Sequence, residues 1–331
     1  MTLIIITNVL ISIAIYFCIA TVLIIIDGKP KSPDSNQNKL SFDELAIDYS
    51  SIPSTKPYQC RDGALLNHRY YPSNSDTVLV LLHGSGWHSQ YFLPLAEYIS
   101  SENIAHVYTP DLRGHGKNPI KRGDISYINQ LVDDIADFVE TIRKAHPHSK
   151  LIISGHSSGG GLAVRFAGSK YGKEADAYLL LSPYLKYNAP TMKLDSGGWA
   201  SAHMPRIVGL SMLNNAKIPW FNYLPVIDFN MPETYRDGTE TLSYSFRLNT
   251  GYAPSNYKKD FISIKQKVLV LVGKADESFI PENFLPELSK YKEDVEVNLL
   301  ENTTHMGIVT GDKIRLVLEE WIAGIESHEK N

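Results

Sequence analysis

The stretch that most constrains the fold of this 331-residue chain is LIISGHSSGGG, which runs from Leu151 to Gly161. Its first three residues are apolar, as in a buried strand, and the residues that follow Gly161 have a helical composition. Ser157 stands between the two, on a turn flanked by glycines whose backbone angles only small neighbours tolerate. Such a turn exposes the serine hydroxyl above the edge of a sheet. Ser157 is therefore the predicted nucleophile.

Other apolar runs alternate with helical patterns, which predicts an α/β fold with a doubly wound, mostly parallel sheet. The expected strands are residues 77–82, 104–109, 151–153, 177–181, 268–272 and 295–300, after a hairpin over 57–71. The expected helices are 93–99, 126–145, 162–167 and 309–325. The second of these helices is the clearest, because its apolar residues recur at steps of three and four.

The alternation breaks between Tyr184 and Tyr257. Twelve of these 74 residues are aromatic and six are proline, whereas aromatic residues make up 10% of the whole chain. The pattern predicts a helical, aromatic-rich insertion that covers the serine as a lid and offers an apolar wall to a substrate chain. A loosely structured insertion with its own small core is the alternative.

Leu3 to Ile26 is a run of 24 residues without a charged side chain. As a helix it would be about 36 Å long, enough to cross a bilayer, so we predict a single-pass membrane anchor. A cleaved signal peptide is the alternative, although no basic residue precedes the run. Lys29, Lys31 and Lys39 follow it, which favours a catalytic domain on the cytoplasmic side.

The predicted organisation is an anchor (1–28), a tether (29–56), the two parts of an α/β core (57–183 and 258–331) and the insertion (184–257) between them. The tether is expected because the residues that follow the anchor are rich in Pro, Gly, Ser and amides. Oligomeric state is not readable from these patterns.

Composition excludes several kinds of partner. The net charge is −4 and no long basic block is present, so nucleic acid is not an expected partner. The two cysteines, Cys18 and Cys60, lie in different segments and show no metal-ligand spacing. No metal and no organic cofactor is expected.

A serine nucleophile needs a base, and the base needs an orienting acid. Asp276 directly follows the expected strand 268–272, and His305 follows the last expected strand. Both therefore lie at carboxyl ends of strands, the same edge of the sheet as Ser157. Asp276 is the predicted acid, with Glu277 as its nearest rival, and His305 is the predicted base.

An oxyanion hole needs two backbone N–H groups that point at one place. Ser158, the first residue of the helix after the nucleophile, offers one. Ser85, between two glycines after the strand 77–82, is predicted to offer the other. His83 and His156 are expected to be structural, whereas Trp87 and His88 are expected either to touch substrate or to pack.

With these residues in place, the chain resembles the α/β-hydrolase superfamily, and more narrowly the monoacylglycerol lipase and lysophospholipase-like serine hydrolases. The resemblance covers about residues 58 to 325 and rests on three motifs, His83-Gly-Ser-Gly86, Asp111-Leu-Arg-Gly-His-Gly116 and Gly155-His-Ser-Ser-Gly-Gly160. It implies a Ser157–Asp276–His305 triad and a structural loop at 111–116. One departure is Lys117-Asn118, where the family usually has a serine shortly after the loop.

The predicted function is hydrolysis of a carboxylic ester of a lipid-like substrate, of monoacylglycerol or lysophospholipid type, through an acyl-enzyme. An amidase or aminopeptidase on the same fold is the first alternative, because the triad does not choose the leaving group. A membrane-tethered binding protein without catalysis is the second. Epoxide or haloalkane chemistry on this fold would need an acid in place of Ser157.

Overall fold

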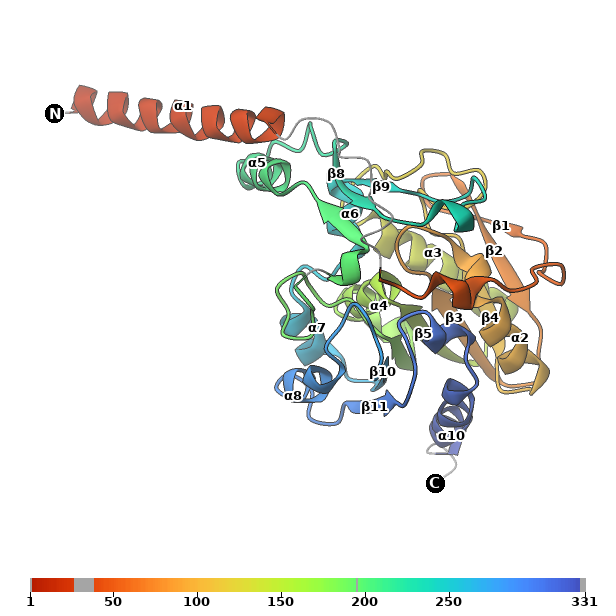
Figure 1. The fold of residues 1–331 in the computed structure, drawn as a ribbon. Helices are drawn as coiled ribbons and strands as arrows, with labels where there is room; N and C mark the ends of the chain where they lie inside the picture. Colours follow the sequence, from red (N-terminus) through yellow and green to blue (C-terminus); the bar gives the residue numbers. More distant parts are fainter. Residues whose placement is uncertain (1, 27–38, 195, 328–331) are drawn as a thin grey trace.

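The structure, a computed structural model, describes residues 2–26, 39–194 and 196–327. An eight-stranded sheet in the order β1-β2-β4-β3-β5-β6-β10-β11 crosses the molecule (Figure 1). Its strands are β1 (Lys56–Gln59), β2 (Leu65–Tyr71), β3 (Thr77–Leu82), β4 (His106–Pro110), β5 (Lys150–His156), β6 (Ala177–Leu181), β10 (Lys267–Gly273) and β11 (Glu296–Leu300). β1 and β2 pair antiparallel, as does β2 with β4, and all the other pairs are parallel. The predicted doubly wound, mostly parallel sheet is confirmed.

The central strands are buried along their whole length because helices cover both faces of the sheet. The helices of the core are α2 (Leu93–Ser101), α3 (Gln130–Ala145), α4 (Ser158–Ala167), α7 (Tyr257–Ser263), α8 (Phe284–Leu288), α9 (Gly307–Thr310) and α10 (Lys313–Ser327). α2 leads from β3 to β4, and α3 leads back past β3 to β5. Since such crossovers are right-handed, this reversal places α2 and α3 on opposite faces.

The reversal makes the carboxyl ends of β3 and β5 a switch point, where neighbouring loops leave the sheet in opposite directions. β3 and β5 are adjacent and in register from Thr77 with Lys150 to Leu82 with Gly155. The loop that carries Ser85 and the turn that carries Ser157 therefore emerge side by side. This is the position at which open α/β sheets place their ligands.

Residues 184–257, the insertion, follow β6 in the chain and lead into α7. They fold above this edge of the sheet (Figure 1). They contain the helices α5 (Met204–Asn215) and α6 (Phe246–Tyr252) and the strands β7 (Ala200–Ala202), β8 (Pro225–Phe229) and β9 (Ser243–Ser245). The three strands form a separate antiparallel sheet in the order β7-β8-β9. The sequence led us to expect helices here, but not this sheet, because its strands are three to five residues long and show no clear alternation.

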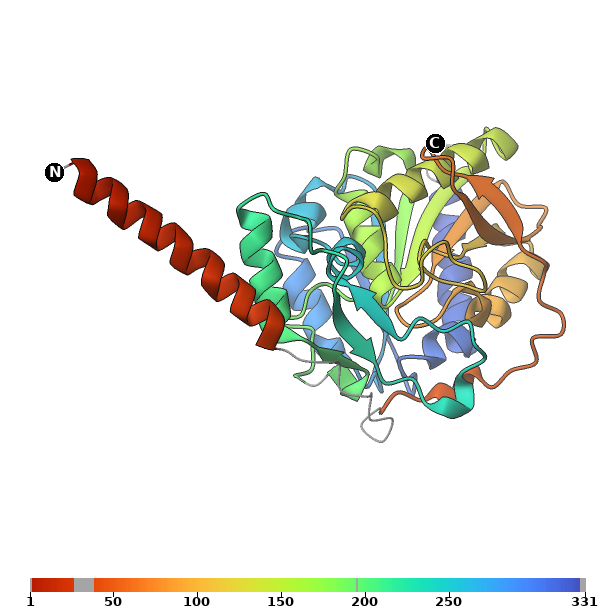
Figure 2. The ribbon, with the colours of Figure 1, turned by 90° about the horizontal axis from the view of Figure 1, so that it is seen from above.

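α1 (Thr2–Ile26) is a long apolar helix that projects from the body of the molecule (Figures 1 and 2). It is long and apolar enough to cross a membrane, a test that a signal sequence also passes. Its second half packs on α5, where the Tyr16 hydroxyl donates to the Met212 carbonyl oxygen at 2.8 Å. Gly209 permits this approach: a Cβ there would lie 2.6 Å from the Ala20 carbonyl oxygen and 2.8 Å from Ile24 Cγ1.

Three expected boundaries differ from the structure. α3 begins at Gln130 rather than Ser126, because the Gln130 side chain accepts a hydrogen bond from the Ser126 backbone N–H at 2.5 Å and ends the preceding turn. The predicted closing helix is two helices, α9 and α10, which are separated at Gly311. The predicted tether lies partly outside the described residues (29–38), and its described part packs against the core through Leu40, Phe42 and Leu45.

Candidate active site

Ser157 occupies the sharp turn between β5 and α4. Its φ and ψ are 54° and −121°, a conformation that a non-glycine residue adopts only when its surroundings enforce it. The enforcement is visible in the backbone: the Ser157 N–H donates to Leu181 O at 2.9 Å, and Ser157 O accepts from Tyr184 N at 2.9 Å. Gly159 is needed because a Cβ there would collide with the backbone carbonyl oxygens of Leu82 and His83. The turn that carries Ser157 is thus held between β3 and β6.

Asp276 and His305 form a buried pair on the loops after β10 and β11. His305 Nδ1 lies 2.8 Å from Asp276 Oδ2, and the two residues are 2% and 1% exposed. Asp276 Oδ1 accepts from the backbone N–H groups of Ser278 and Phe279, each at 2.9 Å. With Nδ1 donating to the carboxylate, the neutral ring keeps its lone pair on Nε2, the atom that a general base must present.

The directions in which the pKa values of His305 and Asp276 are shifted suit the roles of base and orienting acid. Burial by itself would lower the pKa of His305, but the charge and the hydrogen bond of Asp276 outweigh it and raise that pKa above its ordinary value. Burial would likewise raise the pKa of Asp276, and the interactions with His305 outweigh it and lower that pKa. Each residue therefore favours the charged form of the other.

Ser157 and His305 line the same small cavity at the switch point. The described residues include no hydrogen bond between the Ser157 hydroxyl and the His305 ring. Catalytic hydrogen bonds of this kind are often long without substrate and tighten in the substrate complex. The structure therefore brings together all three residues that the sequence singled out for the triad.

The two predicted oxyanion donors flank Ser157. Ser85 follows β3, and Ser158 is the first residue of α4, where backbone N–H groups have no acceptor within the helix. Among the described residues, neither the Ser85 nor the Ser158 backbone N–H has a hydrogen-bond partner. Both serines line a second, larger cavity together with Ser157. The two N–H groups are thus available to a ligand beside the nucleophile.

Three buried tyrosines hold the loop that carries Ser85. The Gly84 N–H donates to the Tyr91 hydroxyl at 2.6 Å, and the Gly86 N–H donates to the Tyr244 hydroxyl at 2.9 Å. The Tyr252 hydroxyl donates to His83 O at 2.6 Å. Tyr244 and Tyr252 come from the insertion, so the insertion fixes the orientation of the Ser85 peptide. Sequence reasoning missed the role of all three tyrosines. The abundance of aromatic residues after Tyr184 was the only signal for Tyr244 and Tyr252, and Tyr91 had none.

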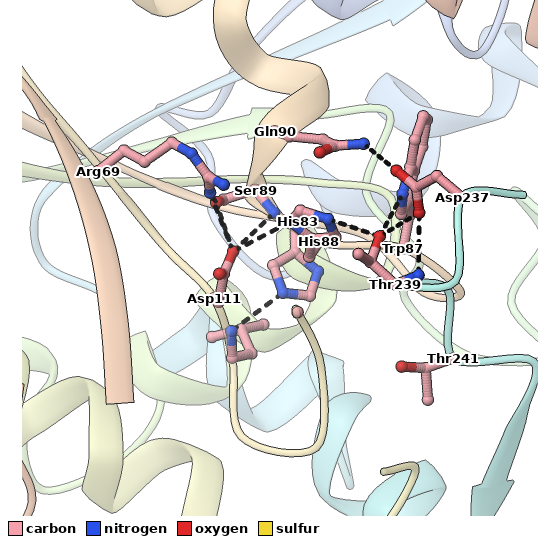
Figure 3. Close-up of polar contacts among 12 residues, drawn as sticks. Arg69, His83, Trp87, His88, Ser89, Gln90, Asp111, Asp237, Thr239 and Thr241 are labelled. Carbon is pink, nitrogen blue, oxygen red and sulfur yellow. Dashed lines mark hydrogen bonds and ion pairs between the residues drawn. The ribbon is translucent and has the colours of Figure 1, made fainter. Parts of the chain in front are cut away.

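A polar network around Asp111 supports the same loop (Figure 3). Asp111 Oδ1 accepts from the Ser89 hydroxyl at 2.5 Å and lies 3.4 Å from Arg69 Nη1 and 3.3 Å from His88 Nδ1. On its other side, His88 Nε2 lies 2.9 Å from Thr239 Oγ1, which also bonds Asp237. Because Thr239 belongs to the insertion, the network connects the insertion to the loop after β3.

This network bears on the roles of His88 and Trp87, which were expected either to touch substrate or to pack. His88 is 2% exposed, lies between Asp111 and Thr239, and lines neither cavity at the nucleophile, so it packs. Trp87 lines the small cavity and also donates to Thr239 Oγ1 at 3.3 Å. His83, expected to be structural, accepts from the Leu112 N–H at 3.0 Å.

The larger cavity is a mainly apolar space of about 580 Å³ between the turn that carries Ser157 and the insertion. Its apolar lining includes Met192, Trp199, Ile207, Val208, Met212 and Phe229. No Asp, Glu, Lys or Arg is among the described residues that line it. α5 forms one wall with one face and contacts α1 with another.

The closest approach to a metal site among the described residues is Cys60, Asp134 and Asp137. Asp134 accepts from Arg113 at 2.7 Å, and Asp137 accepts from Arg61 at 2.7 Å. Both carboxylates are thus neutralised by guanidinium groups, which also repel a cation. The cluster lies on α3 and the β1–β2 turn and does not line either cavity at Ser157.

Comparison with known proteins agrees with this geometry. Residues 73–306 match the family described as "Serine aminopeptidase, S33". The monoglyceride lipase of Homo sapiens is 26% identical over 273 residues, which cover 77% of this chain and 86% of that protein. A monoacylglycerol lipase of Mycolicibacterium smegmatis is 32% identical over 106 residues, which cover 32% of this chain and 37% of that protein.

Solved structures agree on the fold. A soluble variant of monoglyceride lipase from Saccharomyces cerevisiae superposes with a TM-score of 0.63 at 17% identity, covering 85% of this chain and 98% of that one. The Paleococcus ferrophilus monoacylglycerol lipase superposes with a TM-score of 0.57 at 22% identity, covering 78% of this chain and 99% of that one. The chain belongs to the serine aminopeptidase S33 family of the α/β-hydrolase superfamily.

Proposed function

We propose that this protein is a serine hydrolase that cleaves carboxylic esters of lipid-like substrates, of monoacylglycerol or lysophospholipid type. The observation that carries the proposal is the Asp276–His305 pair beside a strained Ser157 that borders a 580 Å³ apolar cavity. The human relative that covers most of this chain is named monoglyceride lipase, which supports the same substrate class.

The mechanism follows from the placement of each group. Ser157 Oγ attacks the ester carbonyl carbon while His305 Nε2 takes its proton, and the resulting imidazolium is stabilised by Asp276. The carbonyl oxygen becomes an oxyanion that accepts hydrogen bonds from the Ser85 and Ser158 N–H groups. The carbon–oxygen bond to the alcohol then breaks, and His305 returns the proton to the departing oxygen.

The remaining acyl-enzyme is resolved by water in the same way. His305 Nε2 removes a proton from the water, whose oxygen attacks the acyl carbon and restores the Ser157 hydroxyl with release of a carboxylic acid. None of these steps requires a cofactor, since the residues supply the nucleophile, the base and the oxyanion donors.

The lining of the cavity favours an ester with an apolar acyl chain over a peptide substrate. An aminopeptidase must neutralise the α-ammonium group of its substrate, and an unpaired buried charge is expensive. The described residues that line the two cavities at Ser157 include no carboxylate. The apolar lining instead suits an aliphatic chain, whose burial contributes about 0.8 kcal/mol per methylene.

We also propose that α1 anchors the protein, with the catalytic domain on the cytoplasmic side and the insertion acting as a lid at the bilayer surface. α1 packs on α5, and α5 walls the cavity, so the anchor would hold the cavity close to the membrane. Met204, Trp220 and Tyr223 of the insertion are 51%, 74% and 49% exposed, and Trp and Tyr are enriched at membrane–water interfaces.

Labelling with a fluorophosphonate probe tests the chemistry. The wild type is expected to form a covalent adduct at Ser157 and to hydrolyse acyl esters faster than the corresponding amides. Ser157→Ala should lose both labelling and activity, by about 10⁶-fold in kcat. Labelling that persists at this site in the variant, or a peptide amide as the best substrate, would contradict the proposal.

A further inference from the structure

Residues 39–45, the strap, lie across the carboxyl edge of β3 and β5. Leu40, Phe42 and Leu45 of the strap are 6%, 2% and 2% exposed, as buried as residues of the core. The Phe42 ring packs at 5.2 Å from the Trp199 ring of the insertion. The strap is thus held between the core and the insertion, directly above the nucleophile.

The strap is also hydrogen-bonded to both loops of the Asp–His pair. The Ser41 N–H and hydroxyl donate to Glu277 Oε1 at 3.1 and 2.7 Å, and Glu277 Oε2 accepts from the His305 N–H at 2.8 Å. The Thr304 hydroxyl lies 2.9 Å from both carboxylate oxygens of Glu44. The strap therefore contacts the residue after Asp276 and the residue before His305.

Two cavities meet at Ser157, and only one of them reaches the base. His305 lines the small cavity and does not line the large one, whereas Ser158 lines the large cavity only. A serine hydrolase returns its proton from the histidine to the leaving group. This arrangement favours the leaving group in the small cavity on the His305 side and the acyl chain in the large cavity.

The strap forms one side of the small cavity. Leu40, Phe42 and Leu45 line it together with Trp87, Met231 and Met306. Its volume is about 10 Å³, compared with about 580 Å³ for the large cavity. A space of about 10–15 Å³ holds one water molecule. Apart from the two histidines, none of its described lining residues is ionisable at neutral pH. These described residues therefore offer no carboxylate, ammonium or guanidinium group that could pair with a charged head group.

We propose that the strap is the leaving-group wall of the active site and restricts the enzyme to long-chain acyl esters of small, uncharged alcohols. The inference rests on the proposed function and narrows its substrate class, since a lysophospholipid would have to place a charged head group against Phe42 and Leu45. The ester carbon–oxygen bond breaks toward the strap, and the small alcohol leaves with the proton from His305 Nε2.

The test is an ester series with one acyl chain and three leaving groups: methanol, glycerol and glycerophosphocholine. The wild type is expected to favour the methyl ester in kcat/KM. Phe42→Ala and Leu45→Ala, which each open the small cavity, should each shift the ratio of glyceryl to methyl ester by about tenfold or more toward the glyceryl ester. Val208→Ala is the matched control, because Val208 lines only the large cavity. It should change the preferred acyl length and leave the leaving-group ratio unchanged.

Failure of the inference and failure of the proposed function give different results. Fluorophosphonate probes expel fluoride, which is small, so labelling of Ser157 should proceed in both strap variants and report that they are folded. If Ser157 is labelled but the leaving-group ratio of the labelled variants equals that of the wild type, the strap does not select the alcohol. A wild type that prefers the glycerophosphocholine ester also overturns the inference. If wild-type Ser157 is not labelled and no ester is hydrolysed, the proposed function itself is wrong.

Discussion

His156 Nε2 donates to the backbone carbonyl oxygen of His305 at 3.0 Å, so the residue before the proposed nucleophile holds the residue proposed as base. The other ring nitrogen of His156 lies 3.2 Å from the Tyr91 hydroxyl, which accepts from the Gly84 N–H. One chain of hydrogen bonds thus runs from the Ser85 loop through Tyr91 and His156 to His305. Burial, and then the charge of His305, lower the pKa of His156 to about 3, so this ring stays neutral at physiological pH.

Replacing His156 with Ala should displace His305 and lower kcat by about 10–100-fold with little change in KM, because a small misplacement of a catalytic group affects chemistry more than binding. Steady-state kinetics on one ester measure both constants. His146→Ala is the control, since His146 is a partly exposed histidine that bonds Tyr108 at 2.9 Å and lines neither cavity at Ser157. Equal losses in the two variants would show that His156 has no positioning role.

The pH dependence of kcat/KM should report His305. Only the neutral ring accepts the Ser157 proton, and the pKa of His305 is raised, so activity should fall with decreasing pH around a midpoint above 6.5. Asp276→Asn removes the two largest interactions that raise this pKa and leaves burial, which lowers it. The midpoint should therefore move to lower pH, while kcat decreases about 10⁴-fold. An unchanged midpoint in Asp276→Asn would assign the titration to another group.

Tyr244→Phe should weaken the support of the oxyanion loop. The Gly86 N–H and His115 Nε2 both bond the Tyr244 hydroxyl, at 2.9 and 2.5 Å, and would lose that partner in a buried site. We expect a loss of about 1–3 kcal/mol in the free energy of unfolding and a lower kcat. Denaturant unfolding and ester kinetics measure the two effects.

Tyr178→Phe separates stability from catalysis in that experiment. The Tyr178 hydroxyl is also buried and donates to a backbone carbonyl, Gly172 O, at 2.6 Å, but Tyr178 lies on β6 and lines neither cavity at Ser157. The Tyr178→Phe variant should lose about as much free energy of unfolding as Tyr244→Phe and keep the wild-type kcat. If Tyr244→Phe also leaves kcat unchanged, the tyrosine serves the fold alone.

The fluorescence of Trp220 can report whether the insertion lies at the bilayer surface. Of the four tryptophans, Trp220 is 74% exposed, whereas Trp87, Trp199 and Trp321 are at most 8% exposed. In vesicles that contain brominated lipids, the Trp220 fluorescence should be quenched, and Trp220→Phe should remove the quenched component. A quenching signal that survives in Trp220→Phe, or no quenching in the wild type, would place the insertion away from the bilayer.

Gly209→Leu should reduce the same quenching, because any side chain at Gly209 meets the Ala20 backbone and Ile24 and separates α1 from α5. Gly324→Leu on α10 is the matched control, since among the described residues outside its own helical backbone no atom lies within 4 Å of a Cβ there. Equal quenching in the two variants would mean that the α1–α5 contact does not orient the insertion.

Much of the fold and the candidate site could be predicted because their signals are local. An apolar run that ends in a glycine-bounded turn marks a strand and the loop at its carboxyl end, and parallel strands bring those loops to one edge. Ser157, Asp276 and His305 could be singled out in this way, and the structure places them together. The split between α9 and α10 escaped prediction because Gly311 and Asp312 interrupt the helix without interrupting the apolar pattern.

By itself, the sequence determined the class of sheet, the turn that carries the proposed nucleophile and the apolar character of α1, since each depends on neighbouring residues. Only the tertiary structure decided which side chains hold the Ser85 loop, where the strap lies and which helix receives α1. Tyr244 and Gly86 are 158 residues apart, and Ser41 and Glu277 are 236 apart. Such contacts depend on how whole elements pack, and no periodicity or motif specifies the partner of a tyrosine hydroxyl or a glutamate across that distance.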